Sequence, residues 1–293
     1  MSDMAKRKAQ IGVIGGSGLY EMPELVKTGR VAVKTPFGPP SDDYELGVIE
    51  GVKVAFLARH GAGHRLLPSE INYRANVYGF KKLGVERIVS VSAVGSLREH
   101  IHPLDMVFVD QFYDRTRGRA STFFGQGLAA HVSFAHPTCA DLSARLLAGA
   151  RQLGLSHHAG GTYVCMEGPA FSTRAESEAY RSRGASVIGM TNLPEAKLAR
   201  EAEICYATVA LVTDYDCWHE EEEAVNVEAV LENLRRNAEN ACKLIATVVP
   251  TLPSAPGACE CPSALSRAII TPPDHVAAPV RKRLKAIIGK YLP

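Results

Sequence analysis

Short apolar runs that end in glycine or small polar residues alternate with amphipathic helical patterns along most of this chain. The longest run, Cys205 to Thr213 (CYATVALVT), spans nine residues and contains no charged side chain. A strand that is covered on both faces of a sheet needs such a run. Strands that alternate with helices are typical of a layered α/β fold. We therefore expect an α/β domain in which Cys205–Thr213 is a central strand.

Glycine and proline delimit the other expected elements. The expected strands are Ile11–Gly15, Val52–Ala58, Arg87–Val94, Asp105–Asp110, Thr162–Met166 and Ser186–Met190. The expected helices are Ser69–Leu83, Thr138–Leu153, Leu193–Ala202, Val225–Val249 and Val276–Lys290. For the first helix we expect Ser69 as the N-cap and Gly84 as the residue that ends it.

The composition changes after Pro250. Residues 251–262 are rich in proline, serine and alanine, as in a linker or irregular loop. The terminal helix that follows carries basic side chains and no acid. It suits either packing near the C-terminus, which we favour, or contact with an anionic partner. We expect one domain over residues 10–250, with residues 251–293 packed on the same domain.

Charge and hydropathy exclude several classes of protein. Lysine and arginine number 33 against 31 acids, a balance that does not suit a dedicated nucleic-acid binder. No apolar run approaches the roughly 18 residues of a membrane span. The polar, basic start lacks the apolar core of a secretory signal, so we expect a cytoplasmic protein.

The chain has seven cysteines at irregular spacings, which define no disulfide framework. Cys259 and Cys261 are separated by one residue. The simpler interpretation of this pair is two free thiols in a mobile tail. The alternative is a redox-active or stabilising pair of cysteines.

Three predicted strand ends carry groups suited to an oxyanion. Gly15-Gly16-Ser17-Gly18 follows the first strand, but it fits neither the dinucleotide fingerprint nor the Walker loop. A tight structural turn explains it equally well. Arg59-His60 follows the second strand, and an arginine fork binds phosphate through two hydrogen bonds. Ser92 and Ala93 lie at the end of the third of these strands, Arg87–Val94. Because ligands of open α/β folds collect at strand ends, we expect these groups to form one pocket.

A second group of strand ends suits a flat, polar ring. Asp214, Tyr215 and Asp216 follow the long central strand, and we expect neighbouring carboxylates to raise each other's pKa. Solvated loop acids are the alternative. Phe171 could stack on a ring, and Glu167 could bind sugar hydroxyls. His60 and His64 have the spacing of a helical metal pair, but the glycines between and beside them argue against a helix, so we expect no metal site.

Several motifs together resemble the trimeric purine nucleoside and methylthioadenosine phosphorylase family. They include IGVIGGSGLY, TPFGPPSD, SAVGSL, DQFYDRT, EGPAFSTRAES, GMTNLPEA and TDYDCW, in order from Ile11 to about Val249. The resemblance implies a single domain with a central mixed, twisted sheet flanked by helices, and a homotrimer with sites at subunit interfaces. It implies phosphorolysis of 5'-methylthioadenosine to adenine and 5-methylthioribose 1-phosphate, a step of purine and methionine salvage. Inorganic phosphate is then a co-substrate, with no metal or organic cofactor.

The resemblance also implies roles for individual residues. Phosphate would be held by Ser17, Arg59, His60, Ser92, Ala93 and Thr191. Met190 would lie against the ribose and Phe171 near the base, while Asp214 and Asp216 would face the purine and carry the catalysis. Ser172 and Val227 would set substrate selectivity. His131 and the C-terminal segment would approach the methylthio group from a neighbouring subunit.

The acids favour one substrate class over another. An ionised aspartate accepts a hydrogen bond from the 6-amino group of adenine but opposes the 6-oxo group of hypoxanthine. A 6-oxopurine or methylthioinosine phosphorylase of the same fold is therefore the alternative enzyme. A nucleoside- or phosphate-binding regulator without catalysis is the alternative outside enzymes.

Overall fold

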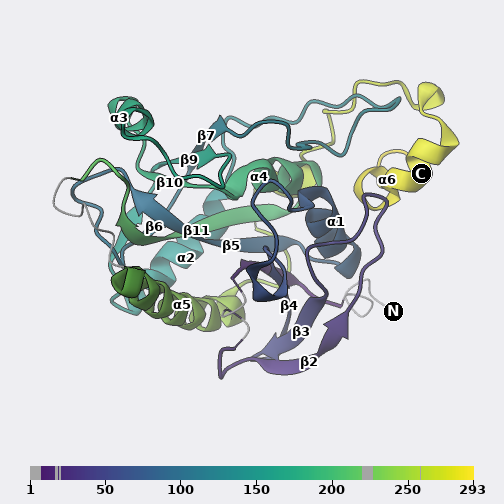
Figure 1. Ribbon diagram of the computed structural model, residues 1–293. Coiled ribbons are helices and arrows are strands. Elements are labelled where there is room, and N and C mark those ends of the chain that lie inside the picture. Colours follow the sequence, from purple (N-terminus) through teal and green to yellow (C-terminus); the bar gives the residue numbers. More distant parts are fainter. Residues whose placement is uncertain (1–7, 17–18, 20, 220–226, 258) are drawn as a thin grey trace.

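The computed structural model has a sheet between two layers of helices (Figure 1). The structure describes residues 8–16, 19, 21–219, 227–257 and 259–293, and only the backbone of residues 227–231. The strands are β1 (Ile11–Gly15), β2 (Val26–Val31), β3 (Tyr44–Ile49), β4 (Val52–Ala58), β5 (Arg87–Ser96), β6 (Met106–Phe108), β7 (Gln111–Arg115), β8 (His157–Ala159), β9 (Thr162–Met166), β10 (Val187–Gly189) and β11 (Cys205–Tyr215). The helices are α1 (Tyr73–Leu83), α2 (Ala140–Gln152), α3 (Arg174–Ser182), α4 (Asn192–Glu201), α5 (Val227–Val248) and α6 (Ala278–Ile288).

The sheet divides into two branches at β5. One path runs β2-β3-β4-β1-β5-β10-β9-β7, and β11, β6 and β8 extend from β5 as a second branch. β1 and β11 run parallel to β5, whereas β10 runs antiparallel to it. The prediction of a mixed sheet in one α/β domain is confirmed.

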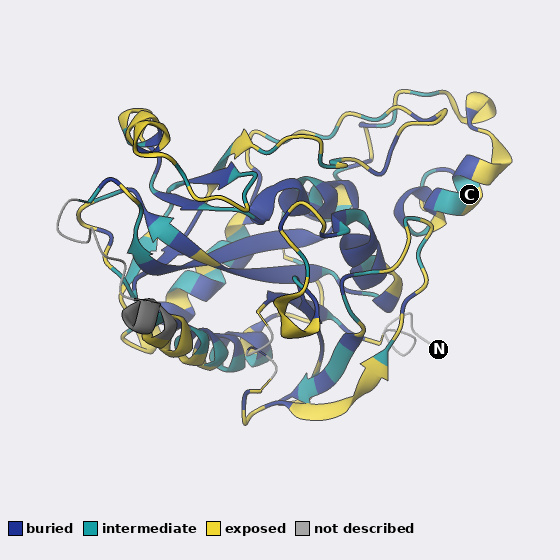
Figure 2. Cartoon of the chain, viewed as in Figure 1, coloured by how far each residue is buried: buried dark blue, intermediate teal, exposed yellow. Residues whose placement is uncertain are grey.

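Side chains of β5 alternate between the two helical layers. Ile88 and Val94 pack in the core that includes α1, α4 and α6. Val89 and Val91 pack in the core that includes α2 and α5. Figure 2 shows β5 and β11 buried along most of their length. Because helices cover both faces, β11 has no polar face, and the prediction of a central strand at Cys205–Thr213 is confirmed.

The start of the first helix differs from the sequence prediction. α1 begins at Tyr73, and the side chain of Asn72, not of Ser69, accepts from the backbone N–H of Ala75 at 3.1 Å. Gly84 ends the helix with a left-handed φ of 89°, as predicted.

The sequence patterns did not indicate β2, β3, β7, β8 or α3. β2 is exposed over most of its length, and only two of the nine residues of α3 are buried. Segments with so little buried surface leave a weak apolar pattern.

The segment after Pro250 packs against the rest of the domain. Leu284 and Ile287 of α6 are buried in the same core as α1, and the Tyr78 hydroxyl donates to the Arg283 carbonyl at 3.1 Å. Ile269 forms a β-bridge with Ala130. No helix in the described ranges is both long and apolar enough to cross a membrane.

Candidate active site

The edge of β5 opens between two partner strands. β1 pairs with β5 up to Ser90, and β10 joins it only at Gly95 and Ser96. Within the described residues, no strand pairs with residues 91–94 on this edge. The Val91 carbonyl accepts from Arg59 there. Because backbone groups along a strand point to alternating sides, the N–H of Ala93 faces the same gap.

Arg59 lies beside this gap and is almost fully committed to the protein. Its Nε and Nη2 donate to the two carboxylate oxygens of Glu195 at 2.9 and 3.1 Å. Nη2 also contacts Ser90 Oγ and the Ile14 carbonyl, and Nη1 donates to the Val91 carbonyl. A guanidinium has five N–H groups, so one N–H of Nη1 is left for a ligand. These contacts among the described residues do not support a two-pronged fork from Arg59 to phosphate, and its role as a phosphate ligand stays a prediction.

Glu195 was not among the predicted site residues, although it lies in the motif GMTNLPEA. Its side chain is fully buried on α4, and it also accepts from the hydroxyls of Ser90 at 2.7 Å and Tyr206 at 2.8 Å. Burial alone would lower the pKa of Arg59, but the Glu195 carboxylate outweighs it and raises that pKa. Glu195 therefore fixes the guanidinium and neutralises much of its charge.

Two of the predicted phosphate ligands meet at the open edge. Ser92 Oγ lies 3.3 Å from Thr191 Oγ1, because β10 runs back along the end of β5. The Tyr163 hydroxyl, which the sequence did not indicate, lies 3.2 Å from Ser92 Oγ. All three side chains are buried. The structure thus brings together a cluster of hydroxyl donors next to the remaining N–H of Arg59.

His60 is half-buried and neutral at physiological pH. Its Nδ1 lies 2.8 Å from the Leu66 carbonyl, which can only accept, so Nδ1 carries the proton. Burial, together with the nearby Arg59 and His64, lowers the pKa of His60 to about 4. The rings of His60 and His64 stack at 4.1 Å, and Gly61 and Gly63 both have positive φ, which agrees with the argument against a helical metal pair.

The catalytic candidate Asp214 is placed by a bulge in β11. Val212 lies opposite Val94 and Asp214 lies opposite Gly95, so Thr213 is an extra residue in the pairing. A bulge re-aims the side chains that follow it. The Thr213 hydroxyl lies 2.5 Å from Oδ2 of Asp214 and holds that carboxylate in place.

Two asparagines of α5 accommodate this bulge. Asn233 donates to the Thr213 carbonyl at 2.9 Å, and the buried Asn237 donates to the Val212 carbonyl at 2.8 Å. Asn233 thus pairs the carbonyl of the extra residue Thr213, while Asn237 adds a second donor to the Val212 carbonyl, which also accepts from the Leu104 N–H at 2.8 Å. The α5 amides were not among the predicted site residues.

Asp214 and Asp216 both lie beside Gly95. A Cβ atom at Gly95 would approach Asp214 Oδ1 to 3.3 Å, a tight contact, and Asp216 Cβ to 3.5 Å, an ordinary one, so both acids lie against this glycine. The pKa of Asp216 is raised, mainly by burial, and the nearby Glu176 contributes. The direction for Asp216 agrees with the expectation, but its cause is burial and not Asp214, and a mutual effect on Asp214 stays a prediction.

Glu167 does not point freely toward a sugar. Its carboxylate accepts from Nε of Arg119 at 3.1 and 3.2 Å and from the backbone N–H of Arg117 at 2.6 Å. Each carboxylate oxygen can accept a further hydrogen bond, so the expectation that Glu167 binds ribose hydroxyls stays a prediction.

Arg119 is a site-building residue that the sequence did not indicate. Besides Glu167, it donates to the carbonyls of Met190 at 2.6 Å and Leu193 at 2.9 Å, and to the Tyr73 hydroxyl at 3.1 Å. Its side chain is 3% exposed. One guanidinium therefore joins the loops that follow β9 and β10, which carry Phe171, Met190 and Thr191.

Two other predicted residues do not pack into this cluster. Phe171 is 83% exposed, so the chain packs little against the ring expected to stack on a base. Tyr215 turns away from Asp214: its hydroxyl bonds to His102 and to the Glu99 carbonyl, so direct contact with substrate is not supported.

The remaining predictions concern selectivity and the neighbouring subunit. The Ser172 hydroxyl contacts the Met166 sulfur at 3.7 Å. The exposed His131 lies on the loop that pairs with the C-terminal segment through a backbone bond to Ala268 at 2.8 Å. Ser17 and the side chain of Val227 lie outside the described residues.

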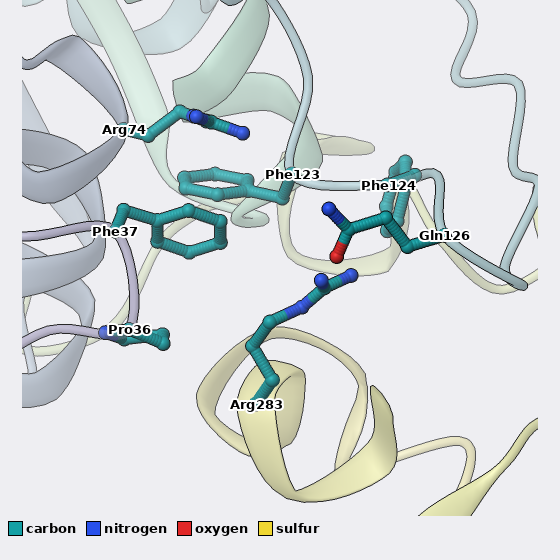
Figure 3. Close-up of a pocket in the computed structure, with 7 residues that line it drawn as sticks. All are labelled: Pro36, Phe37, Arg74, Phe123, Phe124, Gln126 and Arg283. Carbon is teal, nitrogen blue, oxygen red and sulfur yellow. The ribbon is translucent and has the colours of Figure 1, made fainter. Parts of the chain in front are cut away.

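A cavity of about 300 Å³ lies elsewhere (Figure 3). It is lined by Pro36, Phe37, Arg74, Phe123, Phe124, Gln126 and Arg283. None of these is a predicted site residue. We place the candidate active site at the open edge of β5, because the polar groups converge there.

Comparison with known proteins supports a single family. The phosphorylase superfamily matches residues 10–250. S-methyl-5'-thioadenosine phosphorylases of Koribacter versatilis and Geobacter sulfurreducens are both 59% identical to this chain. The alignments cover 97% and 96% of this chain and 97% and 99% of the two relatives.

Solved structures agree. A methylthioadenosine phosphorylase from an antarctic soil metagenomic library has a TM-score of 0.93 at 52% identity, over 96% of this chain and 99% of that one. The methylthioadenosine phosphorylase of Schistosoma mansoni, solved with adenine, has a TM-score of 0.79 at 39% identity. The match covers 83% of this chain and 92% of that one. The chain therefore belongs to the phosphorylase superfamily and, within it, to the family of S-methyl-5'-thioadenosine phosphorylases.

Proposed function

We propose that this protein cleaves S-methyl-5'-thioadenosine with inorganic phosphate, giving adenine and 5-methylthioribose 1-phosphate. The observation that carries the proposal is the convergence at the open edge of β5. There the hydroxyls of Ser92 and Thr191 lie 3.3 Å apart, beside one N–H of Arg59, and Asp214 follows on the neighbouring strand. This arrangement offers donors to an oxyanion and an acid to a leaving base.

Phosphate is held beneath the sugar in this scheme. The hydroxyls, the Ala93 N–H and Arg59 donate to its oxygens, and we assign Ser17 to the same site. Cleavage of the glycosidic bond gives the sugar the character of an oxocarbenium ion. The bound anion stabilises that charge and then forms the new C–O bond. Neutral His60 limits the fixed positive charge around the anion.

The purine leaves as a neutral base. We assign Asp214 to protonation of N7, a step worth about 10²–10⁴-fold in rate. We assign Asp216 to the 6-amino group, and Met190 and Phe171 to the ribose and the base. A 6-oxo group facing an ionised carboxylate would leave unmatched polar groups, at a cost of about 1–3 kcal/mol. No metal or organic group takes part in the reaction.

A second copy of the chain completes the site in this proposal, as a homotrimer. The exposed Phe171 is one site residue that its own chain leaves largely uncovered. Light scattering after size-exclusion chromatography should give a trimer mass. A monomer with full activity would contradict the shared site.

A substrate panel tests the function. Methylthioadenosine, adenosine and methylthioinosine are incubated with and without phosphate, and base release is followed by ultraviolet absorbance. We expect phosphate-dependent release of adenine, with methylthioadenosine as the better substrate. Asp214→Asn should lower its turnover about 10²–10⁴-fold and shift the ratio toward methylthioinosine, whereas Asp43→Asn, an exposed control outside the assigned site, should not. Equal cleavage without phosphate would refute the proposal.

A further inference from the structure

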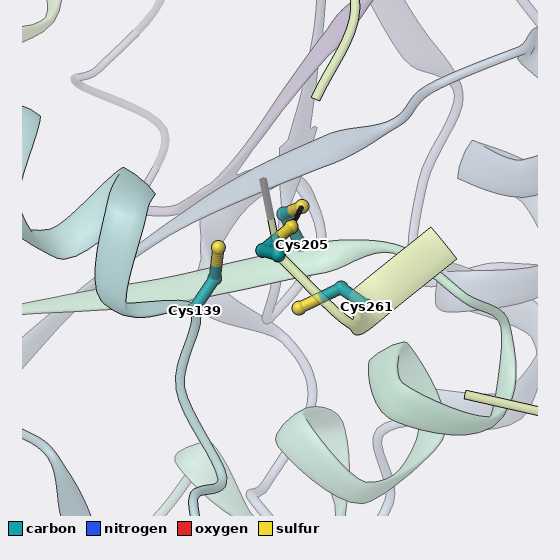
Figure 4. A group of neighbouring side chains, drawn as sticks. Cys139, Cys205 and Cys261 are labelled. Atoms are coloured by element: carbon teal, nitrogen blue, oxygen red, sulfur yellow. Dashed lines mark hydrogen bonds between the residues drawn. The ribbon is translucent and has the colours of Figure 1, made fainter. Parts of the chain in front are cut away.

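Four cysteines form a cluster away from the candidate active site. Cys139 immediately precedes α2, Cys205 begins β11, and Cys259 and Cys261 lie in the C-terminal segment. Their Sγ atoms all lie within 4.8 Å of one another. Figure 4 shows Cys139, Cys205 and Cys261 directed toward one another. Segments more than 50 residues apart in the chain thus contribute to one thiol cluster, which the sequence spacing does not reveal.

The size of the thiol cluster fits a tetrahedral metal ion. Zinc–sulfur bonds are about 2.3 Å long, so four sulfurs around one zinc lie about 3.8 Å apart. Cys205 and Cys259 are separated by 3.5 Å between sulfur atoms, and the remaining pairs reach at most 4.8 Å. A disulfide requires sulfur atoms about 2.05 Å apart, and none of the four is oxidised in the structure.

The surroundings of the cluster favour a closed, structural site. Cys139, Cys205 and Cys261 are buried, and Cys259 is half-buried. Four protein ligands leave no open position for substrate, as in structural rather than catalytic zinc sites. Thiolates select soft or borderline ions such as zinc over magnesium or calcium.

Metal binding at this cluster requires thiolates. A divalent cation bound by all four groups therefore displaces their protons.

We propose that Cys139, Cys205, Cys259 and Cys261 bind one structural zinc ion that fastens the C-terminal segment to the sheet. The two ligands from that segment precede the bridge between Ile269 and Ala130. The ion thus anchors the chain at the point where it begins to support the loop that carries His131. The proposal does not depend on the reaction assigned above.

Metal analysis of the full-length protein tests it directly. The protein is purified without chelator, and its zinc is measured by inductively coupled plasma mass spectrometry. We expect one zinc per chain, released to a chromogenic chelator when an organomercurial modifies the four cluster thiols in addition to accessible thiols such as Cys217. Metal-free protein reconstituted with cobalt(II) should show the visible bands of a tetrahedral thiolate complex.

Matched cysteine variants identify the ligands. Cys139→Ser and Cys261→Ser should lose bound zinc, and limited proteolysis should cut the segment after Pro250 sooner. Cys242→Ser, a half-buried position on α5 outside the cluster, should keep one zinc per chain. If the ligand variants fail to fold, the zinc content and cobalt spectrum of the unmodified chain decide the question.

Three results would overturn the proposal. The first is unmodified protein without zinc whose four thiols react freely. The second is an intact mass, measured without reductant, that shows these cysteines paired as disulfides. The third is zinc that stays bound in the ligand variants, since it would then lie at another site.

Discussion

Replacing Glu195 by glutamine should destabilise the protein and make its stability more dependent on phosphate. The carboxylate is fully buried and accepts two hydrogen bonds from Arg59, whose side chain is only 3% exposed. Glutamine keeps the shape but removes the negative charge, so the guanidinium remains buried without its counter-charge. Breaking such a pair costs about 3–5 kcal/mol. We expect about 3 kcal/mol, because the amide oxygen still accepts one bond.

A second glutamate of α4 provides the control. Glu201 is also buried, but it accepts from the Thr122 hydroxyl and the Phe123 N–H, both at 2.7 Å and both neutral. Burial raises the pKa of Glu201 to about 7, so much of it is already protonated at neutral pH. Glu201→Gln should therefore cost less than about 1 kcal/mol. Comparing the stability of the two variants therefore separates the cost of losing a counter-charge from the cost of losing a buried carboxyl group.

Thermal unfolding with and without phosphate measures both effects. A loss of about 3 kcal/mol corresponds to a fall in Tm of roughly 6–12 °C in a domain of this size. Phosphate then supplies the missing negative charge to Arg59, so it should raise the Tm of Glu195→Gln more than that of the unchanged protein. The reasoning fails if both glutamate variants melt alike, or if phosphate stabilises Glu195→Gln no more than the parent.

Three further predictions concern the bulge, the loops and pH. Asn237→Leu removes the amide that supports the bulge at the Val212 carbonyl, which keeps its bond from the Leu104 N–H. Denaturant unfolding should therefore show a loss of about 0.5–1.5 kcal/mol, and kcat should fall while the KM for phosphate stays nearly constant. Arg119→Lys keeps the charge but not the fork that joins two loops, so steady-state kinetics should show about a tenfold higher KM for the nucleoside. Because the pKa of Glu201 is higher in the folded protein than in the unfolded chain, its contribution to stability falls as pH rises from about 4.5 to 7. The contribution of His60 changes with pH in the opposite direction: it increases the free energy of unfolding from about pH 4 to 6.5, because its pKa is lower in the folded protein. The free energy of unfolding of Glu201→Gln, measured by urea titration, should therefore rise more steeply with pH than that of the parent. An unchanged slope would contradict this.

The local patterns were sufficient to find the strand ends. Arg59, Ser92 and Asp214 each follow or end an apolar run, and β1, β4, β5 and β11 run in one direction. Parallel strands bring their ends to one edge, so residues far apart in the chain could be assigned to one site. Such runs are visible because each strand is covered on both faces.

The contacts that organise the site could not be predicted in the same way. Glu195 lies 136 residues from Arg59, and a buried glutamate on a helix resembles an exposed one until its partner is known. Arg119 lies outside the named helices and strands, so no periodicity marks it. Thr213 continues the apolar run of β11 without interruption, and the one-residue bulge becomes visible only in the pairing with β5.

The division of the sheet at β5 explains why these hidden contacts gather in one place. Where β1 ends and β10 has not yet joined, the edge of a central strand has backbone groups that need partners. Arg59 supplies one donor to the Val91 carbonyl, and an anion bound there would supply acceptors for the neighbouring N–H groups. A buried cation on the edge of a sheet requires a counter-charge, which Glu195 provides from α4. The same gap that creates a place for phosphate therefore creates the need for the ion pair, and this is why the Glu195 variant tests the architecture and the chemistry together.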